Sequence, residues 1–127
     1  MVSDQIANFI VQVKNASERG HAKVSIPHSK LSEHIAELLL QEGLIKSHVK
    51  KGKKIKKILE VELLGGRKIT KAQRISKPSR RIYRSAKELK RFNRIRGLTV
   101  VSTPRGLMSS RSAIKENVGG EVMFNIK

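Results

Sequence analysis

The chain has 127 residues, with 28 Lys or Arg against 10 Asp or Glu, so its formal net charge is +18. It has no Cys, which excludes disulfides, thiolate metal sites and thiol nucleophiles. Aromatic residues make up only 3%, which argues against stacking successive bases on rings, and no apolar run reaches the roughly 18 residues of a membrane-spanning helix. A hydrophobic fraction of 38% can still fill the core of one ordinary domain or two small ones. We therefore expect a soluble, intracellular polycation.

The first 64 residues predict a small layer of helices on a sheet. Apolar residues recur at helical spacing in two segments, each bounded by a capping residue and a glycine. Further on, Leu59, Val61 and Leu63 alternate with Glu60 and Glu62, which predicts a strand with one buried face. The expected order is a helix between Asp4 and Gly20, a strand over 22–26, a helix between Ser29 and Gly43, and strands over 44–49 and 55–64 joined by a Lys-Gly-Lys turn at 51–53.

The second half predicts strands with short helices. A capping box of Ser85 and Glu88 predicts a helix over 86–93, and Ser110 predicts another that ends near Val118. Strands are expected over 67–75, 81–83, 98–103, 107–108 and 121–126, with turns at 76–79, 104–106 and 119–120. The fold class is therefore α+β with two small domains: an N-terminal α-β-α-β-β domain over 1–66, a basic connecting segment over 67–79, and a mainly β domain with short helices over 80–127.

The positive charge is concentrated in the second half. Residues 1–64 carry a net charge of +4 and residues 65–127 carry +14, and 13 basic residues face a single acid, Glu88, between Arg67 and Arg96. Like charges at this density repel one another within a Debye length of about 8 Å and favour a polyanionic partner. Nucleic acid is the polyanion that best fits, because bound Lys and Arg release its condensed counterions. An anionic membrane would require a basic amphipathic helix, and Pro78 interrupts this segment.

Residues that could support catalysis are scarce. Asp4 is the only aspartate and is better explained as a helix cap, while Glu33 and Glu37 lie one turn apart on what we expect to be a solvated face. No glycine-rich phosphate loop and no G-x-S-x-G sequence is present. The four histidines lack the spacing and the neighbouring carboxylates of a metal site: His21, His28, His34 and His48. We expect no enzyme, no cofactor, no metal and no small-molecule substrate.

The segment V-V-S-T-P-R-G-L-M at 100–108 carries the most specific signal. A strand ends in the two hydroxyl residues Ser102 and Thr103, and a turn then presents Arg105 and Gly106. Short hydroxyl groups can reach base edges, sugar hydroxyls or phosphates, glycine lets two backbones approach closely, and arginine supplies a forked cation. The simplest alternative is an ordinary turn, in which the hydroxyl groups bond only to the protein.

The chain resembles the family of small-subunit ribosomal protein number eight, in its bacterial and organellar form. The resemblance covers nearly the whole chain and rests on the opening helix D-Q-I-A-N-F-I-V-Q-V-K-N-A and on P-H-S-K-L at 27–31, E-G-L-I at 42–45, R-I-S-K-P-S-R-R-I-Y at 74–83, S-T-P-R-G-L-M at 102–108 and G-G-E at 119–121. It implies a structural protein of the small subunit that binds rRNA directly and grips an irregular stem of the central domain through its C-terminal half. It also implies neighbouring small-subunit proteins as partners, a monomer within the cytoplasmic or organellar ribosome, and, in some relatives, repression of translation of the protein's own messenger.

The resemblance also implies individual RNA contacts. Ser102, Thr103 and Gly106 match a loop that enters the RNA minor groove, and Tyr83 matches a tyrosine beside it, with a half-buried strand residue as the alternative. Glu121 matches a residue that supports this surface, with orientation of Arg105 or of backbone amides as the alternative. Asn15 and Lys30 match positions near a second rRNA segment, with a helix C-cap as the alternative for Asn15. The full expected set is Ser102, Thr103, Pro104, Arg105, Gly106, Tyr83, Arg80, Arg81, Arg84, Lys77, Asn15, Lys30, Arg111 and Glu121.

Two positions and one segment depart from the family pattern. Pro104 stands where relatives commonly have a small hydroxyl residue, so one side-chain contact to RNA is lost and the turn is stiffer. Ser79 stands where glycine is common, and the hairpin over 50–57 is more basic than usual.

An architectural DNA-binding protein is the alternative function motivated by charge alone, although no helix-turn-helix pattern supports it. An enzyme acting on RNA would need a base or a metal that the sequence does not offer.

Overall fold

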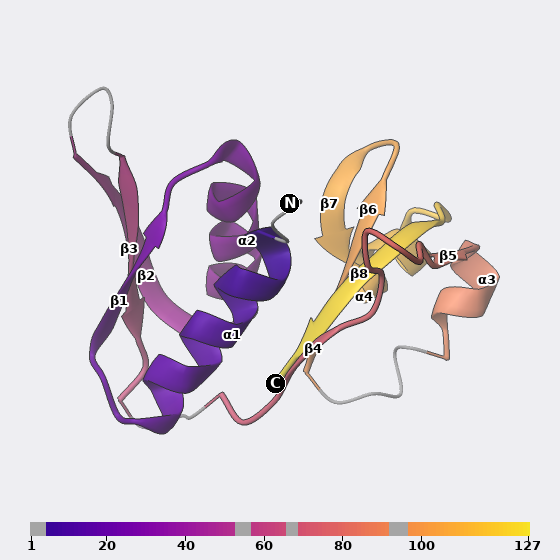
Figure 1. Cartoon of the computed structure of the whole chain (residues 1–127). Helices are drawn as coiled ribbons and strands as arrows, with labels where there is room; N and C mark the ends of the chain where they lie inside the picture. The colour runs from indigo at the N-terminus through magenta and orange to yellow at the C-terminus, as the bar shows by residue number, and fades with distance from the viewer. Residues whose placement is uncertain (1–4, 53–56, 66–68, 92–96) are drawn as a thin grey trace. The chain divides into compact units, whose positions relative to one another are not determined.

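The computed structural model describes residues 5–52, 57–65, 69–91 and 97–127. The chain divides into two compact units, Met1–Thr70 and Lys71–Lys127, each with its own sheet (Figure 1). The predicted α+β class with two small domains is confirmed. The predicted N-cap Asp4, the turn residue at 53 and the start of the strand at 67 lie outside the described residues.

The N-terminal unit is a three-stranded antiparallel sheet in the order β1-β3-β2, with two helices packed on one face (Figure 1). The order along the chain matches the predicted α-β-α-β-β. The elements are α1 (Gln5–Glu18), β1 (Lys23–Pro27), α2 (Lys30–Gln41), β2 (Ile45–Lys51) and β3 (Ile58–Leu63).

Local signals in the sequence explain these boundaries. The Ser29 hydroxyl accepts a hydrogen bond from the backbone of Ser32, whose own hydroxyl accepts from the backbone of Ser29, so a capping box starts α2. Gly43 adopts a φ of 71°, the left-handed conformation that ends a helix at little cost. The alternation in β3 places Leu59, Val61 and Leu63 in the core, as predicted.

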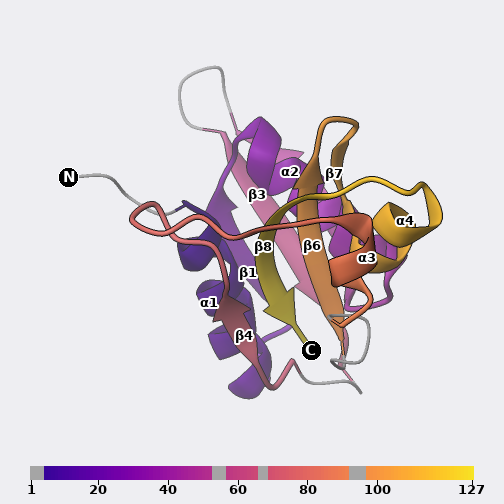
Figure 2. The ribbon, with the colours of Figure 1, turned by 90° about the vertical axis from the view of Figure 1, so that its right-hand side faces the viewer.

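The C-terminal unit is built around its last strand, β8 (Gly120–Ile126). This strand pairs with β6 (Leu98–Thr103) on one edge, and β6 pairs in turn with β7 (Gly106–Ser109). On its other edge β8 pairs with two short strands, β4 (Ala72–Arg74) and β5 (Tyr83–Arg84). The helices α3 (Ala86–Leu89) and α4 (Ser110–Lys115) contact each other beside this sheet (Figure 2).

A compact apolar cluster holds the two helices to the sheet. Leu89 of α3, Val101 of β6, Ala113 of α4 and Val122 of β8 are fully buried in it, and Ile75, Met108, Ile114 and Val118 pack around them. The predicted capping box of Ser85 and Glu88 is present. The helix it starts ends at Leu89, and part of the predicted range to 93 lies outside the described residues.

Several strand ends differ from the sequence prediction by a few residues, and two further differences concern the organisation of the C-terminal unit. The units divide between Thr70 and Lys71, and not across a connecting segment at 67–79, because β4 pairs with β8 and so ties residues 71–79 to the C-terminal sheet. The helix α4 is capped by Ser109 and not by Ser110, since the hydroxyl of Ser109 accepts from the backbone of Ser112. Among the described residues, no helix is both long and apolar enough to cross a bilayer.

Candidate nucleic-acid interface

The turn between β6 and β7 is held from within by Thr103. This side chain is only 8% exposed; its hydroxyl donates a hydrogen bond to the carbonyl oxygen of Gly106 at 2.8 Å and accepts one from the backbone of Arg105 at 3.1 Å. Gly106 has a φ of 113°, a conformation that disfavours any side chain. Thr103 therefore stabilises the turn from inside. The sequence had suggested instead that its side chain points outward.

The outward surface of the turn consists of its neighbours. Pro104, Arg105 and Gly106 are exposed, and Ser102 is partly exposed at the end of β6. In this arrangement the exposed backbone of Gly106 and the guanidinium of Arg105 can approach a ligand. Of the two hydroxyl residues Ser102 and Thr103, only Ser102 remains accessible.

Three predicted residues form a row across the C-terminal sheet. Ser102 of β6 is opposite Glu121 of β8, and Glu121 is opposite Tyr83 of β5. Directly opposed residues project from the same face, and neighbouring strands lie about 4.8 Å apart, so the hydroxyl, carboxylate and phenol line one surface. Tyr83 is 63% exposed, which excludes the alternative that it is a half-buried strand residue.

The carboxylate in this row is paired with an arginine. Oε2 of Glu121 lies 3.1 Å from a guanidinium nitrogen of Arg81, and the Glu121 side chain is 12% exposed against 49% for Arg81. Arg105 instead pairs with Glu116, just after α4, at 3.2 Å. The alternative that Glu121 orients Arg105 is therefore incorrect: it orients Arg81.

Two glycines let β8 begin inside this surface. A Cβ atom on Gly120 would overlap the carbonyl group of Ser102, and one on Gly119 would press on the backbone of Arg84 and Ser85. The G-G-E sequence is thus a packing requirement, because it lets β8 pass close to both the β6 end and the β5–α3 junction. It brings Glu121 into register with Ser102.

The remaining basic residues of the predicted set are all exposed. Lys77, Arg80 and Arg81 lie in a loop between β4 and β5, Arg84 follows in β5, and Arg111 lies in the first turn of α4. One guanidinium nitrogen of Arg84 donates to the carbonyl oxygen of Tyr83 at 2.8 Å. Residues 71–127 hold 15 basic and 3 acidic residues, and the structure gathers the predicted contacts of this half into one unit.

The two other predicted contacts belong to the N-terminal unit. Lys30 is the exposed first residue of α2. Asn15 is exposed on α1, but the helix continues to Glu18, so Asn15 is not its C-cap.

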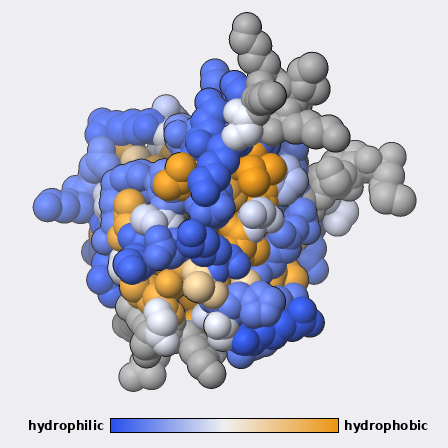
Figure 3. Space-filling model, turned by 90° about the vertical axis from the view of Figure 1, so that its left-hand side faces the viewer, coloured by the Kyte–Doolittle hydropathy of each residue, from blue (hydrophilic) through white to orange (hydrophobic). Residues whose placement is uncertain are grey.

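The outer face of the N-terminal sheet differs in character from the C-terminal unit. Figure 3 views this side of the molecule, where apolar groups show between hydrophilic ones. Three of its lysines lie beside two glutamates: Glu60 contacts Lys23 and Lys51 at 3.4 and 3.2 Å, and Glu62 contacts Lys46 at 3.4 Å. Part of the positive charge of this face is therefore offset within the protein.

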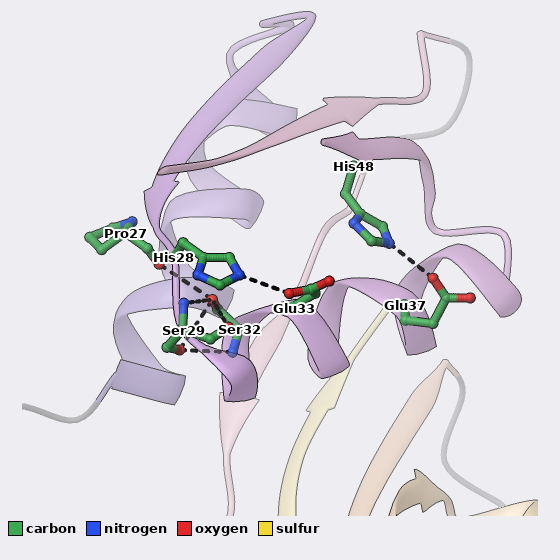
Figure 4. Close-up of polar contacts among 7 residues, drawn as sticks. All are labelled: Pro27, His28, Ser29, Ser32, Glu33, Glu37 and His48. Carbon is green, nitrogen blue, oxygen red and sulfur yellow. Dashed lines mark hydrogen bonds and ion pairs between the residues drawn. The ribbon is translucent and has the colours of Figure 1, made fainter. Parts of the chain in front are cut away.

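Two histidine–glutamate pairs join α2 to the sheet (Figure 4). Nε2 of His28 lies 2.8 Å from Oε2 of Glu33, and Nε2 of His48 lies 2.9 Å from Oε2 of Glu37. The hydrogen bond with His28 lowers the pKa of Glu33. The two glutamate side chains are about half exposed, as expected of a solvated face, but each also pairs with a histidine, which the sequence did not indicate.

These pairs have a structural role. Among the described residues, no three His, Cys, Asp or Glu side chains gather where they could hold a metal ion. Each pair contains one carboxylate and one imidazole. Glu33 of α2 pairs with His28, which follows the end of β1, and Glu37 of α2 pairs with His48 of β2. We assign them to the attachment of the helix.

Two residues of the interface region were not anticipated from the sequence. Ser76 is fully buried beneath the basic loop, and Glu116 pairs with Arg105. The position of Ser76 between a predicted strand and Pro78 indicated a turn, but nothing in the sequence indicated that Ser76 bonds to Ile82. Glu116 gave no signal, because its pairing depends on how α4 packs against the β6–β7 turn.

Comparison with known proteins agrees with the resemblance seen in the sequence. Residues 4–126 match the family described as Ribosomal protein S8. Curated relatives named small ribosomal subunit protein uS8 include those of Pelagibacter ubique, 39% identical over 98% of both chains, and Mycoplasmopsis agalactiae, 42% identical over 98% of both. The protein of Rhodopseudomonas palustris is 39% identical over 97% of this chain and 96% of its own. The chain therefore belongs to the ribosomal protein S8 family, a family of structural proteins that are not enzymes.

Proposed function

We propose that this chain is a structural constituent of the small ribosomal subunit that binds rRNA directly. In this proposal the C-terminal unit grips an irregular stem of the central domain and helps that domain to assemble. In the subunit the chain is proposed to be present as a monomer and to have neighbouring small-subunit proteins as its protein partners. The observation that carries the proposal is the row Ser102–Glu121–Tyr83 beside the exposed turn at 104–106, within a unit of net charge +12.

The chemistry of this surface suits folded RNA better than a DNA duplex. A-form RNA has a deep, narrow major groove and a shallow minor groove lined with 2′-hydroxyls, so proteins recognise its shape and its irregular bases. The Ser102 hydroxyl and the backbone of Gly106 are small enough to approach that shallow groove. Arg105 can reach a phosphate or a base edge from the same turn.

The surrounding cations would fix the orientation of the stem. Arginine and lysine contacts to phosphates position a protein on a nucleic acid without reading its sequence. Lys77, Arg80, Arg84 and Arg111 are exposed in the same unit and are proposed to serve this purpose. Asn15 and Lys30 are proposed to approach a second rRNA segment from the N-terminal unit.

Recognition by shape also supports a regulatory role. A messenger that folds into a stem of the same irregular shape would present the same groove and phosphates to this surface. We propose that the chain can bind such a stem in its own messenger and repress its translation. Competition between the two stems for one protein would test this role.

A binding competition tests the main proposal. An irregular stem from the central domain of small-subunit rRNA and a DNA duplex of equal length are titrated at fixed salt. We expect tight binding to the stem, weak binding to the duplex, and, for about six neutralised phosphates, a log–log salt slope of magnitude about 4–5. Equal affinity for both nucleic acids would instead support the architectural DNA-binding alternative.

Chemical footprinting of small-subunit rRNA with and without the protein would locate the site. Protection of a single irregular stem is expected. Diffuse protection over many helices would contradict a specific interface. Cleavage of labelled RNA in the presence of magnesium would contradict a structural role.

A further inference from the structure

One strand edge in the C-terminal unit is interrupted by an extruded loop. The backbone of Ser76 donates to the carbonyl oxygen of Val122 at 3.1 Å, and the backbone of Val122 donates to the carbonyl oxygen of Ile82 at 2.9 Å. Ser76 and Ile82 therefore occupy adjoining places along β8, although five residues separate them. The segment 77–81 leaves the sheet between β4 and β5 and returns to the same edge (Figure 2).

A single buried hydroxyl closes the neck of this loop. Ser76 is 0% exposed, and its hydroxyl accepts a hydrogen bond from the backbone of Ile82 at 2.8 Å and donates one to the carbonyl oxygen of Ile82 at 3.2 Å. At the tip, Lys77 and Arg80 exchange two backbone hydrogen bonds, each of 2.9 Å, around Pro78 and Ser79. Both ends of the loop are thus fixed in the free protein.

The loop concentrates positive charge. Lys77, Arg80 and Arg81 are all exposed, and they follow one another within five residues. Like charges carried on so short a segment repel one another where salt does not screen them. Glu121 offsets Arg81 through its ion pair at 3.1 Å. A shape that holds these cations together gains stability when an anion approaches.

We propose that the loop at 77–81 is a preformed phosphate-binding element and that buried Ser76 is its positioning residue. This inference rests on the proposed RNA-binding function and deepens it by naming the ligand group, the phosphates of the RNA backbone. A loop that is already ordered loses less conformational entropy on binding than a flexible one. Ser76 touches no RNA and acts through the shape of the loop.

The test compares three variants of the full chain with the wild type, on the same rRNA stem. Ser76→Ala removes the hydroxyl of the neck and keeps every cation, so we expect about a tenfold loss of affinity with a nearly unchanged salt slope. Arg80→Ala removes one cation, so both the affinity and the magnitude of the salt slope should fall, the slope by about 0.7–0.9. Thr99→Val is the matched control, because Thr99 is also a buried hydroxyl in this sheet, bonded to Asn125 at 2.9 Å, away from the loop.

Amide hydrogen exchange of the free protein supplies a readout that does not depend on RNA. Exchange at the Ile82 amide, which donates to Ser76, should be faster in Ser76→Ala by tenfold or more and unchanged in Thr99→Val. If Ser76→Ala does not fold, Pro78→Gly loosens the exposed tip without touching the core and should also weaken binding.

The outcomes separate the two proposals. A wild-type chain that does not bind the stem contradicts the proposed function, and the exchange data then still decide whether Ser76 orders the loop. Wild-type binding with full affinity in both Ser76→Ala and Pro78→Gly overturns the role of a preformed loop. Unchanged protection of the Ile82 amide in Ser76→Ala overturns the positioning role of Ser76.

Discussion

The hydroxyl of Thr103 and the carbonyl oxygen of Gly106 are joined by a hydrogen bond of 2.8 Å across the β6–β7 turn. The bond keeps the hydroxyl inside the protein, where it also accepts from the backbone of Arg105. A similar arrangement recurs at the neck of the basic loop, where Ser76 bonds both backbone groups of Ile82. Buried hydroxyl groups thus shape both exposed segments of the proposed interface, and the exposed residues around them are the ones proposed to contact RNA.

Replacing Thr103 by Val should weaken the turn without changing its size. The variant removes two hydrogen bonds from the turn, to the carbonyl of Gly106 and from the amide of Arg105, which should cost about 0.5–1.5 kcal/mol of folding free energy and reduce selectivity for the RNA stem. Thr103→Ser keeps the hydroxyl and should retain most of both properties. Chemical denaturation and stem-versus-duplex competition measure the two effects. Equal behaviour of the Val and Ser variants would show that the hydroxyl does not shape the turn.

A methyl group at Gly120 should be poorly tolerated. It would overlap the carbonyl group of Ser102, so β6 and β8 must move apart, and we expect a loss of about 1–3 kcal/mol in the free energy of unfolding. Gly65→Ala is the matched control, because a Cβ atom there meets nothing within 4 Å. Thermal unfolding of the two variants provides the comparison. A Gly120→Ala variant as stable as Gly65→Ala would show that the strands have room to adjust.

The end of β6 at Thr103 was predictable, but the inward orientation of Thr103 was not. Residues two apart in a strand share a face, so Thr103 follows Val101 and Ser102 follows Val100, and both valines are fully buried. The apolar pattern of the strand therefore does not distinguish the two hydroxyl residues. The difference arises in the turn, where the hydroxyl of Thr103 bonds to the backbone of Gly106 and Arg105.

Most element boundaries were also predictable, because their causes are local. The strand β6 begins and ends where its β-branched residues predicted, and the capping boxes at Ser29 and Ser85 mark the starts of α2 and α3. The extruded loop was not predictable. It depends on Ser76 and Ile82 meeting Val122, which is about 40 residues away in sequence, and no local pattern specifies such a pairing.

Acid should destabilise the fold through its paired carboxylates. Hydrogen bonds from Ser47 and Lys46 lower the pKa of Glu62, and the bond with Lys51 lowers the pKa of Glu60, each from an ordinary value of 4.5. A carboxyl group with a lowered pKa in the folded state stabilises that state above its ordinary pKa. The contribution is lost as the pH falls through the lowered value. Denaturation at a series of pH values should therefore show stability that decreases below about pH 4.5.

The double variant Glu60→Gln, Glu62→Gln provides the control for this titration. Its free energy of unfolding should depend less steeply on pH in the same range, because two of the linked protons are removed. Glu88, whose pKa is lowered by the backbone and side chain of Ser85, remains in this variant and should preserve part of the slope. Identical pH profiles for the variant and the wild type would assign the acid sensitivity to other groups.

Neutralising Glu121 should reduce selectivity while it raises affinity. Glu121→Gln keeps the size of the side chain but removes the ion pair that orients Arg81, and it raises the net charge of the C-terminal unit by one. We expect tighter binding to any nucleic acid and a several-fold smaller preference for the stem over a duplex. Binding of both ligands at one salt concentration measures the ratio. An unchanged ratio would mean that the orientation of Arg81 plays no part in recognition.

The ion pair of Arg105 with Glu116 should compete with RNA. Both side chains are largely exposed, at 61% and 42%, so the pair contributes only roughly 0–1 kcal/mol, and a phosphate can displace it. Glu116→Gln should leave stability unchanged and raise affinity for the stem by up to about fivefold, since Arg105 no longer has to leave a partner. Glu42→Gln makes the same charge change on an exposed glutamate of the N-terminal unit and should raise affinity less. Equal gains in the two variants would reduce the effect to net charge, whereas a larger gain for Glu116→Gln would identify Arg105 as a direct contact.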